Sequence, residues 1–170
     1  MRPSASDRDG WLQSARILLI GADFGTRKII RTLLLSMGAT DVHDAPAGEA
    51  GLAAAAELDP DLVILEWQAP GMRGAEFVRR LRADDRLACA SVPIIMLTDH
   101  HASIPVAEAM RLGVRGFLVK PVSGPALYER LVSVLTAPRL RHAATVAPSL
   151  QPQGDSRPVD DRAPDAIVLE

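Results

Sequence analysis

Short runs of consecutive apolar residues recur along the middle of the chain. Four of them are unbroken, at 17–20, 62–65, 94–97 and 117–119, and a weaker one covers 42–45. Short runs that are apolar at nearly every position are typical of strands buried on both faces, as in a parallel sheet. The pattern therefore predicts five strands.

Helical patterns separate these runs. Ile30, Leu33, Leu34 and Met37 repeat at the spacing of an amphipathic helix, and Gly38 offers a stop. Other helical segments are expected at 47–57, 76–83, 105–113 and 127–135. Five repeats of a strand followed by a helix predict a layered α/β fold with a parallel sheet, whose functional site lies at the carboxyl ends of the strands.

The two ends of the chain differ from this middle part. Residues 1–15 are mostly polar, and we expect them to form a flexible lead. Residues 138–170 hold five of the 13 prolines and no aromatic residue, which predicts a disordered, proline-rich tail. A single folded domain is therefore expected at 16–137.

Composition narrows the classes of function. A net charge of −2 gives no field that would attract DNA. No apolar stretch approaches the length of a membrane span, and the start has no apolar segment of a secretory signal. The one cysteine excludes a disulfide within the chain. We expect a cytoplasmic protein that binds neither DNA nor membrane.

Polar residues follow four of the predicted strands. Asp23, Glu66, Thr98 and Lys120 should converge at one edge of the sheet. The ammonium would pair with a carboxylate, and the hydroxyl could donate to the same group. This chemistry alone fits a structural ion-pair network as well as it fits a functional site.

Four segments carry a family resemblance: PDLVILEW at 60–67, APGMRG at 69–74, VPIIMLT at 92–98 and GFLVKPV at 116–122. With them, the domain at 16–137 resembles a bacterial two-component response regulator receiver domain of the chemotaxis-regulator type. The resemblance implies a flavodoxin-like (βα)5 three-layer sandwich, with a parallel five-stranded sheet in the order 2-1-3-4-5.

The resemblance also assigns roles to positions. In the family, acidic residues after the first strand hold magnesium, and an aspartate ending the third strand takes a phosphoryl group from a histidine kinase. A hydroxyl residue and a lysine contact that group, and an aromatic residue acts as a switch. Thr98, Lys120 and Phe117 match the hydroxyl, the lysine and the aromatic position.

Other family positions are changed in this chain. Glu66 stands at the phosphoacceptor position, Gly21 and Ala22 replace the acidic pair, and Asp99 stands where a small residue is usual. Asp23 is the acidic residue that remains. Magnesium prefers oxygen ligands in near-octahedral geometry, so we expect weak or absent binding, with Asp23 and Glu66 as residual ligands and no cofactor.

Glu66 is open to two interpretations. Its carboxylate lies one methylene farther from the backbone than that of aspartate, so it can mimic, in part, a phosphorylated aspartate. Alternatively, it is the residue left by drift, or one with a fixed structural role, after phosphorylation became unnecessary.

The resemblance thus predicts a pseudo-receiver in phosphorelay signalling. It would not be an enzyme, and it would bind a histidine kinase, a phosphotransfer protein, another regulator or a second copy of itself. The implied partner surface is 103–136, with these exposed candidates: Arg111, Arg115, Tyr128, Glu129 and Arg130. Two alternatives stay open. One is a receiver phosphorylated on Glu66 or Asp23, and the other is a small-ligand sensor that binds, for example, a cyclic dinucleotide at the changed cleft or at Arg139 and Arg141.

Overall fold

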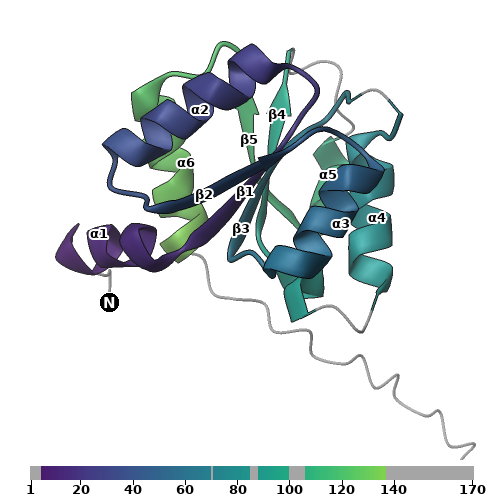
Figure 1. Ribbon diagram of the computed structural model, residues 1–170, viewed down its shortest axis with the longest axis horizontal. Coiled ribbons are helices and arrows are strands. Elements are labelled where there is room, and N and C mark those ends of the chain that lie inside the picture. The colour runs from purple at the N-terminus through teal and green to yellow at the C-terminus, as the bar shows by residue number, and fades with distance from the viewer. Residues whose placement is uncertain (1–4, 70, 85–87, 100–105, 137–170) are drawn as a thin grey trace, which may run out of the picture.

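A five-stranded sheet lies at the centre of the computed structural model, which describes residues 5–69, 71–84, 88–99 and 106–136. All neighbouring strands pair in parallel, in the order β2-β1-β3-β4-β5 (Figure 1). The parallel sheet and its strand order are as predicted. The strands are β1 (Arg16–Ile20), β2 (Asp41–Ala45), β3 (Leu62–Glu66), β4 (Ile94–Thr98) and β5 (Val114–Val119).

The strands fall on the predicted apolar runs, with one difference at an edge of the sheet. β5 begins at Val114, three residues before the run at 117–119. Its buried residues alternate with half-buried ones, whereas β3 and β4 are buried at every position. An edge strand is covered less completely than a central one, so it does not require a continuous apolar run.

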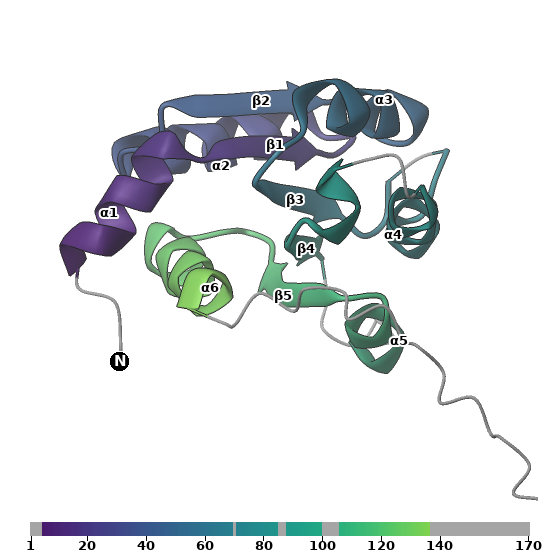
Figure 2. The same cartoon turned by 90° about the horizontal axis from the view of Figure 1, so that it is seen from below.

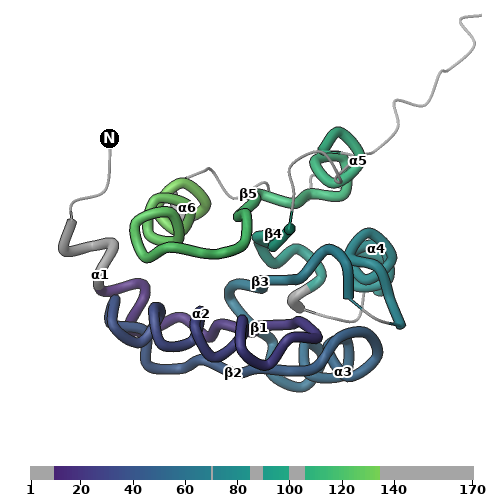
Figure 3. The backbone as a smooth tube through the Cα atoms, turned by 90° about the horizontal axis from the view of Figure 1, so that it is seen from above, coloured from purple at the N-terminus to yellow at the C-terminus, as the bar shows by residue number. Residues whose placement is uncertain are grey.

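Helices cover both faces of this sheet. Figures 2 and 3 show α2 and α6 on one side and α3, α4 and α5 on the other. The predicted helices are all present, and α2 begins six residues before the predicted stripe because Asp23 caps it. The bounds are α2 (Phe24–Ser36), α3 (Glu49–Leu58), α4 (Gly74–Ala83), α5 (Val106–Arg111) and α6 (Gly124–Thr136), with a short 3-10 turn, η1 (Ala88–Ser91).

The sheet separates two hydrophobic cores. Along β1, Ile17 and Leu19 point into the core under α2 and α6, whereas Leu18 and Ile20 point into the core under α3, α4 and α5. Alternate side chains of a strand face opposite sides of the sheet, so burial on both sides requires apolar residues at every position. This is the physical reason for the unbroken apolar runs.

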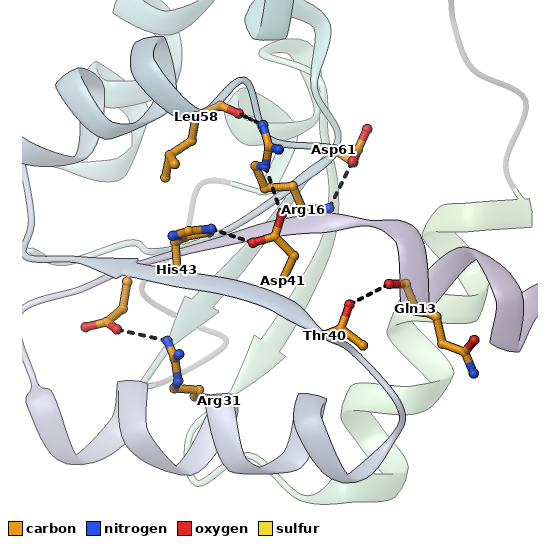
Figure 4. Close-up of polar contacts among 9 residues, drawn as sticks. Gln13, Arg16, Arg31, Thr40, Asp41, His43, Leu58 and Asp61 are labelled. Carbon is orange, nitrogen blue, oxygen red and sulfur yellow. Dashed lines mark hydrogen bonds and ion pairs between the residues drawn. The ribbon is translucent and has the colours of Figure 1, made fainter.

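An additional helix, α1 (Ala5–Ser14), precedes the first strand. We expected a flexible lead at 1–15, and the structure instead packs Leu12 into the core beside α2 and α6, where it is 5% exposed. The hydroxyl of Thr40 donates to the carbonyl of Gln13 at 2.7 Å (Figure 4). The polar composition of this segment led to the wrong expectation, because the contacts of Leu12 and Trp11 with the core are enough to hold a short helix.

A polar cluster ties the start of β1 to β2 and α3 (Figure 4). Arg16 Nε donates to Asp41 Oδ2 at 3.0 Å, and its guanidinium also donates to the carbonyl of Leu58 at the end of α3. His43 Nε2 lies 2.5 Å from the other carboxylate oxygen of Asp41. The backbone N–H of Arg16 donates to the carboxylate of Asp61. The bond from Arg16, and then that from His43, lowers the pKa of Asp41. The cluster lies at the end of the sheet opposite the predicted site.

Within the described ranges, no helix is long and apolar enough to cross a bilayer. The predicted tail at 138–170 lies outside the described residues.

Candidate functional site

The carboxyl edge of the sheet brings the predicted site residues together. Glu66 is the last residue of β3, Thr98 is the last of β4, and Lys120 directly follows β5. Hydrogen bonds between the backbones continue past the strand ends, and the backbone N–H of Lys120 donates to the Thr98 carbonyl at 2.8 Å. These bonds fix the position from which each side chain starts.

Glu66 is held by a donor on each of its carboxylate oxygens. The backbone N–H of Ala22 donates to Oε2 at 2.8 Å, and the ammonium of Lys120 pairs with Oε1. The residue is only 7% exposed. Charged side chains are rarely buried to this degree unless they are paired, and here each oxygen accepts from a donor.

Lys120 binds a second carboxylate as well. Its Nζ lies 3.0 Å from Asp99 Oδ1, and the Asp99 side chain is 58% exposed whereas that of Lys120 is 16% exposed. Burial alone would lower the pKa of Lys120, but the hydrogen bonds to Glu66 and Asp99 outweigh it and raise that pKa. The site therefore holds a protonated lysine between two acids.

Asp23, the acidic residue that remains after β1, is bound at the start of the following helix. It is the N-cap of α2, and its carboxylate accepts from the Thr26 N–H at 2.7 Å, from the Thr26 hydroxyl and from the Gly25 N–H at 3.3 Å. The side-chain bond from Thr26 is the main cause that lowers the pKa of Asp23. Its oxygens are used to satisfy the free N–H groups at the start of the helix.

The residues present do not fit a magnesium ion. Gly21 and Ala22 carry no side-chain oxygen, Asp23 caps α2, and Glu66 is paired with an ammonium. In the part of the chain that the structure describes, no group of three or more histidine, cysteine, aspartate or glutamate side chains could hold a metal. The positive charge opposite Glu66 comes from Lys120 instead.

Two predicted switch positions lie under this edge of the sheet. Thr98 is buried at 3% exposure. Phe117, on β5, is half-buried and packs against the core beneath α3, α4 and α5. Their positions agree with a path between the site and β5, but their roles as contact and switch residues stay predictions.

The predicted partner surface wraps the β5 edge. α5 and α6 flank β5 on opposite sides (Figure 2). Arg111, Tyr128 and Glu129 are exposed there, whereas Arg115 is half-buried. Arg130 is also half-buried. Its aliphatic stem lies across Gly116, in the space that a Cβ atom at that position would occupy.

Several residues at these sites were not singled out by the sequence. Val106 and Met110 are apolar side chains on α5 that are 48% and 56% exposed. Their spacing of four residues can be read from the sequence, but a six-residue helix gives no pattern that separates its buried positions from its exposed ones.

Arg27 is another residue that the sequence did not single out. Its guanidinium donates to the Gly21 carbonyl, and no motif connects these two positions. Arg139 and Arg141 lie outside the described residues.

The chain is similar to known proteins along most of its described length. The family model described as response regulator receiver domain matches residues 17–132. The chain is 34% identical over 115 residues to chemotaxis protein CheY-3 of Vibrio cholerae, covering 67% of this chain and 87% of that protein. It is 34% identical over 118 residues to chemotaxis protein CheY of Pseudomonas aeruginosa, covering 69% and 94%.

Two further comparisons extend these matches. The transcriptional regulatory protein AfsQ1 of Streptomyces coelicolor is 37% identical over 119 residues, which are 70% of this chain but 50% of that protein. Among solved structures, the chemotaxis response regulator CheY4 of Vibrio cholerae superposes with a TM-score of 0.64 at 29% identity, covering 71% of this chain and 98% of that one.

Proposed function

Because the chain belongs to the response regulator receiver family, we propose that it is a receiver that signals by binding a protein partner without being phosphorylated. Receiver domains of this family act in two-component signalling and interact with histidine kinases and other proteins.

One observation carries the proposal: the Glu66 carboxylate is already bound on both oxygens. The Ala22 N–H and the Lys120 ammonium occupy them, and the residue is nearly buried. A phosphoryl transfer to Glu66 would need a free carboxylate oxygen in line with the donor, and charge compensation for the transferred group. Both requirements are opposed by the pairing and by the poor fit to magnesium.

Asp99 adds to this opposition. Its carboxylate lies on the same ammonium as Glu66, at 3.0 Å. An incoming phosphoryl group would have to compete with two carboxylates for Lys120, and it would meet a like charge beside it. Phosphorylation of Asp23 is opposed as well, because that carboxylate caps α2.

The test is intact mass after incubation with a small-molecule acyl phosphate and magnesium. The natural chain is expected to gain no phosphate. The control is the variant Ala22→Asp/Glu66→Asp/Asp99→Ala, which returns an acid and an aspartate acceptor and removes the competing charge; it should gain one phosphate. Stoichiometric phosphate on the natural chain would overturn the proposal and make the chain a working phosphoacceptor.

The proposed partner is a histidine kinase, a phosphotransfer protein or another regulator, and the proposed surface is the face of α5, β5 and α6. Three exposed apolar side chains, Val106, Met110 and Tyr128, lie on its two helices. Exposed apolar groups of this kind are typical anchors of protein interfaces. Self-association through the same face is the homodimer form of the proposal, which sedimentation equilibrium measures directly.

Variants on this face separate binding from folding. Met110→Ser and Tyr128→Ser should weaken affinity for the source organism's purified histidine kinases or phosphotransfer proteins at least tenfold, in a surface-binding assay. Leu35→Ser, an exposed apolar position on α2, is the matched control and should leave affinity unchanged. Equal loss in all three variants would speak against the α5–β5–α6 face.

The charge of Glu66 is part of the same proposal. If the carboxylate stands in for a phosphorylated aspartate, Glu66→Gln lowers partner affinity although the side chain keeps its length. Unchanged affinity in Glu66→Gln and Glu66→Ala would leave Glu66 with a structural role only.

A further inference from the structure

We infer that Gly21 and Glu66 are a coupled pair, in which the absent side chain at position 21 makes the space that the Glu66 carboxylate fills. The inference deepens the proposed function and rests on it only in treating the Glu66–Lys120 pair as the resting state of the site.

The geometry at Gly21 is close. A Cβ atom built on Gly21 would lie 2.9 Å from Glu66 Oε2, which is nearer than real Cβ atoms approach another heavy atom. The same Cβ would lie 3.4 Å from Glu66 Cβ and 3.7 Å from Glu66 Cδ, both tolerable distances. The conflict therefore concerns the end of the glutamate side chain and not its stem.

The glutamate cannot move away without losing its partners. Oε2, the atom in conflict, is the one that accepts from the Ala22 N–H at 2.8 Å, and Oε1 is held by Lys120. A side chain at position 21 would make the carboxylate shift, and the shift would stretch or misalign these bonds. The carboxylate would then be left buried with weaker hydrogen bonds, which is costly.

Glycine is not needed at position 21 for its backbone. The described glycines with positive φ are Gly38, Gly48, Gly71 and Gly113, and Gly21 is not among them. An alanine at a compatible backbone position usually stabilises a protein slightly, because it restricts the unfolded chain. Space for Glu66 is thus the requirement that position 21 has to meet.

The pair also explains how the site manages without magnesium. A shorter acceptor leaves room beside it for an acidic side chain from the end of β1, whereas the longer Glu66 fills that room and takes its positive charge from Lys120. An acidic residue at position 21 would therefore compete with Glu66 for the same space and would place a like charge beside it. Restoring an acid at position 21 should therefore succeed only when residue 66 is shortened.

A double-mutant cycle on thermal unfolding tests the coupling. Gly21→Ala should lower the Tm of the natural chain by about 3–6 °C, and it should change the Tm of the Glu66→Asp variant by less than about 1 °C. Gly25→Ala is the matched control, because a Cβ there meets Asp23 at an ordinary 3.4 Å; it should behave alike in both backgrounds. Equal Tm losses for Gly21→Ala in both backgrounds would overturn the inference.

Magnesium binding by titration calorimetry gives a second, independent measurement. Gly21→Asp/Glu66→Asp should bind magnesium at least tenfold more tightly than Gly21→Asp alone. Similar affinities for the two variants would also overturn the coupling. Neither measurement uses phosphorylation, so phosphate found on the natural chain would refute the proposed function while a positive cycle would still establish the pair.

Discussion

At the scale of single residues, one ammonium serves two carboxylates that differ in exposure. Lys120 contacts Glu66, whose side chain is 9% exposed, and Asp99, whose side chain is 58% exposed. Water screens the second contact but not the first. Breaking a buried pair leaves an uncompensated charge, whereas an exposed pair contributes little.

This difference predicts unequal effects of matched amide substitutions. Glu66→Gln should lower the free energy of unfolding by about 2–3 kcal/mol because the partly buried Lys120 ammonium loses its buried acidic partner and keeps the exposed Asp99. Asp99→Asn should lower it by about 1 kcal/mol or less. Urea unfolding at neutral pH measures both, and equal losses would contradict the assignment of Glu66 as the main partner.

Asp23 gives a prediction for acid pH. Its pKa is lowered in the folded state, chiefly by the Thr26 side chain, so its contribution is present above the unfolded value of about 3.9 and is lost as pH falls through the lower folded value. Asp23→Asn keeps a capping oxygen but cannot titrate. The variant's Tm should therefore fall less than that of the natural chain between pH 5 and about pH 3.

The control for this experiment is Asp59→Asn, an equal charge change at an exposed position with φ 47° that asparagine also adopts. It should leave the acid limb of the Tm curve unchanged. A flattened acid limb in Asp59→Asn as well would mean that net charge, and not the cap, sets the response.

At the scale of elements, one side chain of α4, Arg82, binds the segments that lead into two strands. The guanidinium of Arg82 donates to the carbonyls of Ala90 and Val92, before β4, and lies within 3.5 Å of those of Leu112 and Gly113, before β5. A planar group with five donors suits several carbonyls that converge from different segments. Arg82 thereby links α4 to the starts of two strands.

Arg82→Ala should lower the free energy of unfolding by about 2–3 kcal/mol, because partly buried carbonyls lose their donor. Arg82→Lys should recover only part of this, since an ammonium reaches fewer of them. The control is Arg79→Ala, on the same helix as Arg82, which removes an exposed pair with Glu108 of α5 and should cost about 1 kcal/mol or less. Chemical unfolding that ranks Arg79→Ala with Arg82→Ala would contradict this account.

At the scale of the whole molecule, the site and the proposed partner face are connected through β5. Lys120 follows β5 directly, and α5 and α6 flank that strand (Figure 2). The proposed function holds that a phosphodonor does not act on the site, because Glu66 is already paired there. The face should therefore be insensitive to phosphodonor in the natural chain.

Hydrogen exchange followed by mass spectrometry measures this directly. Addition of an acyl phosphate and magnesium should leave exchange in residues 106–136 unchanged in the natural chain. In Ala22→Asp/Glu66→Asp/Asp99→Ala, the same addition should alter exchange there by more than twofold in rate. A response of the natural chain would show that its site is open to phosphodonor.

The sequence by itself determined the five strands, the order of helices and the family. A strand buried on both faces needs an apolar residue at every position, and this requirement can be read along the chain without knowing any contact. The sequence also placed Glu66, Thr98 and Lys120 at one edge of the sheet, because parallel strands present their carboxyl ends together.

Only the tertiary structure decided how those residues are used. The donors on Glu66 come from positions 44 and 54 residues away, and the space beside Gly21 depends on where the glutamate side chain ends. The docking of α1 through Leu12 depends on the apolar residues of α2 and α6 that share its core, and these are remote in sequence. Distances of a few tenths of an ångström between segments that are remote in sequence decide such contacts, and packing alone sets them.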